Sequence, residues 1–351
     1  MYIKDISLRN YRNYEDSFFS FSPEGSLIIG KNGKGKTNLL EAISYFAYGR
    51  STLNHQDEQL ICHGKDAFRI KSIFCVEDID TEYMVSFCKE KKKIIHYENK
   101  QLRKLSDLYK LLQIVYSAPD DIYNIFTTPA KRRNFIDMAI SKIYPVYIEY
   151  LRNYKNALHQ RNSLLKIEFN QKEKEAWDKV FCEAAYHITE YRLKFFSLFR
   201  DEVSKSHSML IDKEEDIEIV YKYNYYSSDD FISKMMVLLH KNIANEKKQQ
   251  TSLYGPHRDD FIVLINKKDA QHFASQGQKR SLVISFKIVL ANIIKNINKI
   301  NPILIFDDTL AELDVYRSNY LLSNLTKSHQ IFIASPTLTK YKTVDLPVLE
   351  L

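Results

Sequence analysis

Apolar positions alternate with polar ones along the first third of the chain, which predicts strands. Residues 2–8 and 14–21 predict two strands around a polar turn, and residues 26–29 predict a short buried strand. Residues 68–95 predict a β-meander. The basic run 89–93 falls at its expected hairpin tip, where it serves either as a solvated turn or as a contact to phosphate.

Helical spacing takes over in two places. Directly after the third strand, five apolar residues predict a helix: Leu39, Leu40, Ile43, Phe46 and Ala47. From about residue 120 to residue 205 the helical period is sustained, which predicts several antiparallel helices. Residues 216–226 then have strand character and residues 230–239 helical character, before an α/β pattern returns after residue 251.

This order predicts an α/β head that is discontinuous in sequence and contains an inserted, mainly α-helical second domain. We expect the head to comprise residues 1–118 and 250–351, and the helical domain residues 119–249. A chain of 351 residues with 44% hydrophobic content is large enough for one or two buried cores.

Charge and cysteine content add weaker constraints. The net charge of +7 is compatible with an acidic partner such as nucleic acid, although many unrelated proteins share it. The four cysteines form no CxxC pair, so a zinc site is not expected, and such sparse cysteines suit a reducing cytoplasm. The N-terminus lacks the apolar core of a signal peptide and no run approaches eighteen apolar residues, so we expect a cytoplasmic protein without a membrane span.

One segment matches the phosphate-binding P-loop pattern at every fixed position. Its residues are Gly30, Lys31, Asn32, Gly33, Lys34, Gly35, Lys36 and Thr37, between the third strand and the first helix. Backbone N–H groups of such a loop surround phosphates at a helix N-terminus. Lys36 is expected to reach the β- and γ-phosphates of ATP, and Thr37 to ligate Mg²⁺.

An apolar run, residues 302–306, ends in Asp307 and Asp308. Asp307 is the expected Mg²⁺ carboxylate, and Asp308 would orient or deprotonate the attacking water. Most ATPase heads of the ABC type have glutamate at this second position, so the shorter aspartate predicts slow turnover. The alternative is a surface acidic pair at a strand end. Asp314, in the following loop, is expected to meet a partner head.

Ser275, Gln276, Gly277 and Gln278 precede a predicted helix about thirty residues before Asp307. The simple interpretation is a helix cap with Ser275 as the capping residue. In ABC-type heads the same position binds the γ-phosphate held by the other subunit. The second interpretation therefore predicts an ATP-dependent homodimer, with Ser275 acting in trans.

Taken together, these motifs resemble those of the RecF family, bacterial recombination-repair ATPases related to SMC heads. The resemblance covers nearly the full length and includes residues 30–43, 49–51, 131–137, 160–165, 255–260, 275–280, 307–308 and 312–314. The chain departs from the family pattern at residues 116–121, 128–129 and 334–337. The resemblance implies ATP-dependent dimerisation, binding of single- and double-stranded DNA at gaps or junctions, and recombinase loading with RecO and RecR.

Several basic residues are candidates for direct contacts. Lys131, Arg132 and Arg133 are hypothesised to bind DNA phosphates, with an equally weighted alternative in which this helix-end cluster pairs with Asp137 or with carbonyl groups. Arg50 is a second DNA candidate. By similarity to related heads, Arg12 and Asn13 are expected either to touch the nucleotide or to shape the first hairpin turn. His257 and Arg258 are interpreted as a structural junction where the chain re-enters the head.

Other functions remain as alternatives at this point. A nuclease-coupled ABC ATPase would need a nuclease domain, and we expect none because the chain ends soon after Asp314. A transporter ATPase would be expected to have a switch histidine near residue 335 and a shorter helical insertion. Another SMC-like, ATP-gated DNA-binding module with negligible turnover is not distinguished by sequence.

Overall fold

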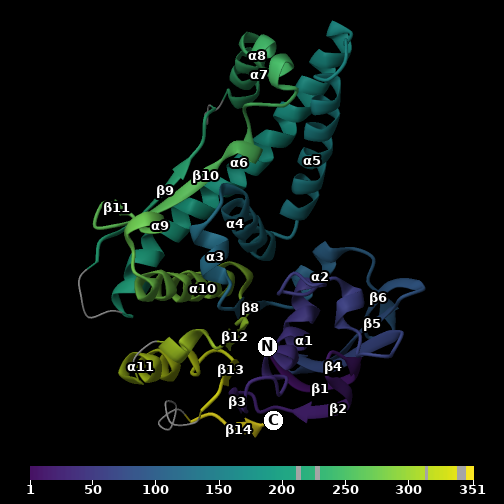
Figure 1. Ribbon diagram of the computed structural model, residues 1–351, viewed down its shortest axis with the longest axis vertical. Coiled ribbons are helices and arrows are strands. Elements are labelled where there is room, and N and C mark those ends of the chain that lie inside the picture. The colour runs from purple at the N-terminus through teal and green to yellow at the C-terminus, as the bar shows by residue number, and fades with distance from the viewer. Residues whose placement is uncertain (211–214, 226–229, 313–314, 338–344) are drawn as a thin grey trace. The chain divides into compact units, whose positions relative to one another are not determined.

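The computed structural model describes residues 1–351 except 211–214, 226–229, 313–314 and 338–344. Its chain divides into two compact units (Figure 1). Unit 1 comprises Met1–Ile122, Ser206–Glu214 and Ser275–Leu351, and unit 2 comprises Tyr123–Lys205 and Glu215–Ala274.

These boundaries differ from the expected domains, which assigned residues 250–274 to the head. Strand β10 (Asp260–Ile265) pairs with β9 (Ile217–Lys222) along its full length, and this pairing keeps the segment in unit 2. The return of an α/β pattern after residue 251 therefore marks a small sheet of unit 2, and the return to unit 1 comes later, at Ser275.

A five-stranded parallel sheet forms the centre of unit 1. Its order is β14-β3-β13-β12-β8, and every neighbouring pair is parallel. The strands are β3 (Gly25–Ile29), β8 (Ile114–Ser117), β12 (Ile303–Asp307), β13 (Ile331–Ser335) and β14 (Val348–Glu350). The three inner strands are apolar and buried, as expected for a sheet covered on both faces. Their carboxyl ends meet at one edge, where open parallel sheets bind ligands.

A six-stranded antiparallel sheet of order β2-β1-β4-β5-β6-β7 forms a second layer of unit 1. Its strands are β1 (Tyr2–Tyr11), β2 (Tyr14–Ser20), β4 (Ala67–Val76), β5 (Ile79–Cys88), β6 (Lys91–Tyr97) and β7 (Lys100–Gln101). The expected pair of N-terminal strands and the β-meander are confirmed. Alternate residues of β4 face the core, including Phe68, Ile70 and Phe74.

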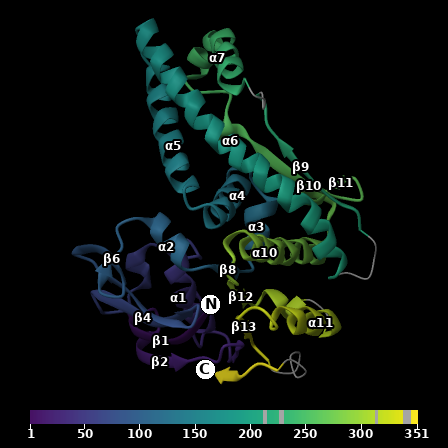
Figure 2. The ribbon, with the colours of Figure 1, turned by 180° about the vertical axis from the view of Figure 1, so that it is seen from behind.

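Helix α1 (Lys36–Tyr48) lies between the two sheets (Figures 1 and 2). Its Phe46 packs edge-on against Phe74 of β4 and Tyr83 of β5, with ring centroids 5.5 and 6.4 Å apart. Further helical segments of unit 1 are η1 (Asp57–Leu60), α2 (Leu105–Leu111), α10 (Gln276–Asn298), η3 (Thr309–Glu312) and α11 (Val315–Leu325), with α3 (Asp121–Phe126) at the unit boundary.

Helix α10 and helix α11 lie on the side of the parallel sheet opposite α1 (Figure 2). Among the described helices, α10 alone is long and apolar enough to cross a membrane by composition, a property that the sequence analysis did not anticipate. Because 67% of that apolar window is buried inside the protein, α10 is a core helix of unit 1.

Unit 2 is mainly helical. Its helices are α4 (Pro129–Ile143), α5 (Tyr147–Leu164), α6 (Gln171–Ser208, whose last turn belongs to unit 1), α7 (Phe231–Lys241), α8 (Ile243–Gln249), η2 (Pro256–Arg258) and α9 (Ala270–Phe273). A three-stranded antiparallel sheet of order β11-β10-β9, with β11 at Lys268–Asp269, adds to the expected helices. The buried Arg161 ties α5 to α6 and α8 through Asp178 at 2.8 Å and Glu246 at 2.5 Å.

Candidate nucleotide-binding site

The P-loop connects β3 to α1, as its sequence predicts. Gly33 and Gly35 have φ values of 84° and 105°, which side chains rarely adopt. A Cβ atom on Gly35 would lie 2.6 Å from the Asn13 amide nitrogen and 2.7 Å from the Tyr14 hydroxyl, so a side chain there would displace both groups in addition to straining the backbone. The Lys36 side chain, which is 5% exposed, donates to the carbonyls of Gly30 at 2.7 Å and Lys31 at 3.3 Å. The ammonium group is therefore held inside the loop that would surround phosphates.

The first hairpin turn supports this loop from outside. Asn13 donates its amide to the Lys34 carbonyl at 3.3 Å and accepts from Asn38 at 2.7 Å. Arg12 forms a two-point ion pair with the fully buried Glu41 of α1, with nitrogen–oxygen distances of 2.9 and 3.0 Å. The ion pair with Glu41 favours a structural role for Arg12. Asn13 contacts the P-loop backbone directly.

Asp307 ends β12 at the carboxyl edge of the parallel sheet. Its Oδ1 accepts from the Thr37 hydroxyl at 3.1 Å, so residues 270 positions apart in sequence meet here. Its Oδ2 accepts from the Tyr116 hydroxyl at 2.8 Å. Burial raises the pKa of Asp307 to about 6, against the lowering effect of these two hydrogen bonds.

The sequence analysis did not single out Tyr116. It is the last but one residue of β8, the parallel neighbour of β12, and it pairs in register with Ile305, two residues before Asp307. Two neighbouring strands of this kind present their last side chains at the same edge. A signal was therefore available, although it required knowledge of the strand order.

The residues at this edge fit a Mg²⁺ ion. Thr37 and Asp307 offer hard oxygen atoms of the type that Mg²⁺ prefers. Asp308 follows with φ of 51°, and burial raises its pKa. Within the described residues, its buried Oδ1 has no hydrogen-bond donor. This acceptor therefore has an unused hydrogen-bonding capacity beside the P-loop.

A cavity of about 320 Å³ adjoins this edge of the sheet. It is lined by Asn32 of the P-loop, by Asp308 and Thr309, and by Arg280 and Ile284 of α10. The cavity therefore lies where the P-loop, the acidic strand end and α10 meet. It gives a solvent molecule access to Asp308 beside the loop.

Ser275 caps α10. Its hydroxyl accepts from the Gln278 backbone at 3.2 Å, and the Gln278 side chain accepts from the Ser275 backbone at 2.8 Å, which together form a capping box. The helix-cap interpretation is thus confirmed. Ser275, Gln276 and Gly277 are also exposed, so the cap leaves them accessible to another molecule.

The proposed basic contacts separate into two groups. Arg132 is 6% exposed and forms an ion pair with Asp260 at 2.7 Å, and Arg133 donates to the Asp259 carbonyl at 2.8 Å. Both arginines are therefore engaged inside unit 2, as in the structural alternative. Arg50 is exposed, whereas Lys131 lies 3.3 Å from the Tyr123 ring centroid. Asp314 lies outside the described residues.

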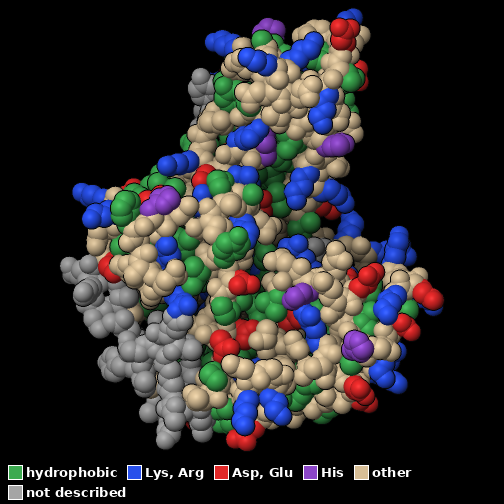
Figure 3. Space-filling view, in the orientation of Figure 1, with side chains coloured by type: hydrophobic (Ala, Val, Ile, Leu, Met, Phe, Trp, Pro, Cys, Tyr) green, Lys and Arg blue, Asp and Glu red, His purple; other side chains and the backbone are tan. Residues whose placement is uncertain are grey.

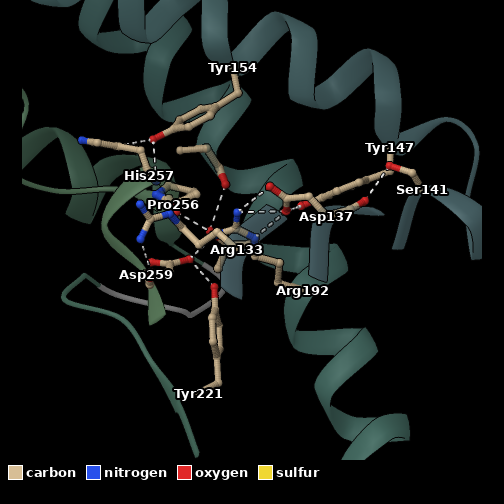
Figure 4. A network of polar contacts seen from close by, with 12 residues as sticks. Arg133, Asp137, Ser141, Tyr147, Tyr154, Arg192, Tyr221, Pro256, His257 and Asp259 are labelled. Atoms are coloured by element: carbon tan, nitrogen blue, oxygen red, sulfur yellow. Dashed lines mark hydrogen bonds and ion pairs between the residues drawn. The ribbon is translucent and has the colours of Figure 1, made fainter. Parts of the chain in front are cut away.

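The segment around His257 belongs to a buried polar network of unit 2 (Figure 4). Arg192 of α6 binds Asp259 at 2.7 Å and Asp137 at 2.9 Å. Tyr154 contacts His257 at 2.6 Å, and desolvation lowers the pKa of His257 to about 4. A histidine that is neutral near pH 7 and held on both ring nitrogens suits a structural role. The expected place of the junction is wrong, because His257 lies within unit 2 and the chain re-enters unit 1 only at Ser275.

Comparison with known proteins agrees with this geometry. Residues 2–347 match the family described as "RecF/RecN/SMC N terminal domain". A DNA replication and repair protein RecF from Clostridium botulinum (strain Eklund 17B / Type B) is 34% identical over 326 residues, covering 93% of this chain and 90% of that protein. The RecF of Bacillus cytotoxicus is 34% identical over 362 residues, covering 99% and 97%. The chain belongs to the RecF family.

Solved structures support the family fold. The recombination mediator protein RecF-ATPrS of the RecFOR pathway superposes with a TM-score of 0.89 at 27% identity, covering 100% of this chain and 96% of that one. The corresponding RecF-ATP structure gives 0.88 at 28% identity, covering 96% and 92%. An Smc head bound to a domain of ScpA, at 16% identity and a TM-score of 0.59, shares the fold. This RecF-family chain is thus an ABC-type ATPase of DNA replication and repair.

Proposed function

We propose that the protein is an ATP-switched DNA-binding mediator that works as a homodimer. ATP between two heads would be bound by the P-loop of one protomer and by the exposed N-terminus of α10, with Ser275 and Gly277, of the other. The observation that carries the proposal is the pairing of Thr37 with Asp307 beside Lys36, at the edge where β3 and β12 end.

Each residue has a defined task in this proposal. Lys36 would exchange its two carbonyl partners for the phosphate oxygens of ATP. Thr37 and Asp307 would hold Mg²⁺, which supplies charge neutralisation at the phosphates. Asp308 would accept a proton from, or orient, a water molecule through its unpaired Oδ1. Its aspartate side chain is one methylene shorter than glutamate, so we expect slow turnover that resets the dimer.

The wider role rests on the relatives. RecF proteins are DNA replication and repair proteins, and two solved relatives act in the RecFOR pathway. We infer that the ATP-bound dimer binds single- and double-stranded DNA at gaps or junctions in the cytoplasm and assists recombinase loading with RecO and RecR. Arg50 is retained as a proposed phosphate contact, whereas Arg132 and Arg133 are not, because both are engaged within unit 2.

On the face drawn in Figure 3, lysine and arginine side chains are spread widely and are interspersed with acidic ones. The net charge of +7 is therefore not gathered into one dominant basic patch on that face. DNA binding is expected to depend on particular sites and on dimerisation.

Light scattering with and without ATP and Mg²⁺ tests the switch. The wild-type protein should be monomeric without ATP and dimeric with it. Lys36→Ala should abolish the ATP-dependent dimer, and Asp308→Asn should prolong its lifetime. Lys71→Ala, on the outer face of the antiparallel sheet, serves as a control that should behave as wild type. A mass that is independent of ATP would reject the shared-nucleotide arrangement.

A further inference from the structure

Four cations line a groove formed by strands β1, β4, β5 and β6 of the six-stranded antiparallel sheet. They are Arg9 of β1, Arg69 of β4, and Lys91 and Lys92 of β6, and all four are exposed. The groove has a volume of about 300 Å³. The remaining lining residues are mostly small or apolar: Asn10, Ala67, Phe68, Ser86, Phe87, Cys88 and Ile94. We call this feature the sheet groove.

The strand register brings like charges together in the sheet groove. Arg9 lies directly opposite Arg69 in the β1–β4 pair, and Arg69 lies opposite Ser86 in the β4–β5 pair. Like charges directly opposite each other destabilise a sheet. Asp16 lies opposite Arg9 on the other side, in β2, yet the two side chains form no ion pair.

Neighbouring lysines show what an ordinary surface cation of this sheet does. Ion pairs join Lys4 to Asp80 at 2.6 Å, Lys71 to Glu82 at 2.7 Å, Lys89 to Asp66 at 2.9 Å and Lys93 to Asp57 at 2.9 Å. In the described part of the chain, none of the four groove cations has a carboxylate oxygen within 4.0 Å. The four groove cations therefore lack the acidic partner that these four neighbouring lysines have.

We propose that the sheet groove binds the phosphodiester backbone of nucleic acid. Negative phosphates placed between Arg9 and Arg69 would relieve their repulsion, and Lys91 and Lys92 could reach a neighbouring phosphate from the groove wall. Arginine and lysine contacts of this type hold a strand without selecting its sequence. The apolar floor suits the sugar. This inference rests on the proposed DNA-binding function and assigns part of it to unit 1.

Fluorescence anisotropy with a labelled, gapped DNA duplex tests the proposal at several salt concentrations, in the presence of ATP and Mg²⁺. Arg9→Gln/Arg69→Gln is compared with Lys4→Gln/Lys71→Gln. Both double variants remove two charges from β1 and β4, but the second removes cations that already have acidic partners. ATP hydrolysis without DNA and the thermal midpoint report on folding and should match wild type in both.

The groove variant should reduce the slope of log affinity against log salt by about 1.8, since each lost phosphate contact contributes about 0.9. Between 50 and 200 mM salt, the DNA affinity of the groove variant should therefore fall by a factor roughly 12-fold smaller than the factor for wild type. The control variant should keep the wild-type slope. An unchanged slope in the groove variant would overturn the proposal. If the slope were unchanged and the binding of polyglutamate were weakened, the groove would be assigned to an acidic protein instead of nucleic acid. If wild-type protein bound no DNA, the proposed function itself would fail.

Discussion

The buried carboxyl of Asp307 should make the stability of unit 1 depend on pH in a defined direction. Its pKa is about 6 in the folded protein, above the ordinary value of 3.8, because it is desolvated. A group whose folded pKa is raised stabilises the fold most fully below its unfolded pKa, and that stability is lost as pH rises through the folded pKa. The relevant window is therefore about pH 4 to 6, extending to pH 7.

The magnitude follows from the two pKa values. A difference of about 2.2 pKa units corresponds to about 3 kcal/mol in the free energy of unfolding. Roughly 1.3 kcal/mol of this should be lost between pH 5 and pH 7, where the native carboxyl ionises while the unfolded one is already ionised. Asp307→Asn cannot ionise, so it should lack this component.

Urea denaturation of unit 1, followed without nucleotide or Mg²⁺ at pH 5, 6 and 7, measures the effect. From pH 5 to pH 7, the unfolding free energy of wild type should fall by about 1.3 kcal/mol relative to that of Asp307→Asn. Asp66→Asn, a change at a surface carboxylate whose side chain is 85% exposed, is the control. A difference between Asp307→Asn and wild type that does not change from pH 5 to pH 7 would refute a raised pKa at this site.

Three further predictions concern individual contacts. Tyr116→Phe removes one hydrogen bond to Asp307 and should raise the activation free energy of Mg²⁺-dependent ATP hydrolysis by about 1.5–3 kcal/mol. Tyr123→Phe, at an exposed tyrosine, should leave the hydrolysis rate unchanged. Gly35→Ala should weaken ATP binding at least about tenfold more than Gly33→Ala in calorimetry, because both share positive φ but a Cβ atom collides only at Gly35. Arg192→Met leaves Asp137 and Asp259 without their cation and should cost about 3–5 kcal/mol in denaturant unfolding, compared with no large change for the exposed Arg152→Met.

The sequence predicted most of the elements that position the ATP site. The P-loop, the strand before Asp307 and the helix after Ser275 were identified because each combines a fixed residue pattern with an apolar period. The family fold followed from the order of these motifs. Local patterns of this kind can be recognised in the sequence because their residues are close to one another along the chain.

What the sequence could not provide are contacts between distant strands. The role of Tyr116 depends on β8 lying beside β12, and the engagement of Arg132 depends on Asp260, which is 128 residues away. The boundary at residue 250 was misplaced for the same reason, since β10 returns to pair with β9 of unit 2. The basic run 89–93 also did not reveal which of its cations are paired. Lys89 and Lys93 form ion pairs with Asp66 and Asp57, whereas Lys91 lines the sheet groove without an acidic partner in the described part of the chain.

The strand order β14-β3-β13-β12-β8 has a consequence for biosynthesis. Strand β3, which precedes the P-loop, hydrogen-bonds only to β13 and β14 within the parallel sheet, and these follow it by about 300 residues. At a translation rate of about 5–20 residues per second, β3 would wait roughly 15–60 s for its partners. The growing polypeptide must therefore protect an apolar strand until almost the whole chain has left the ribosome.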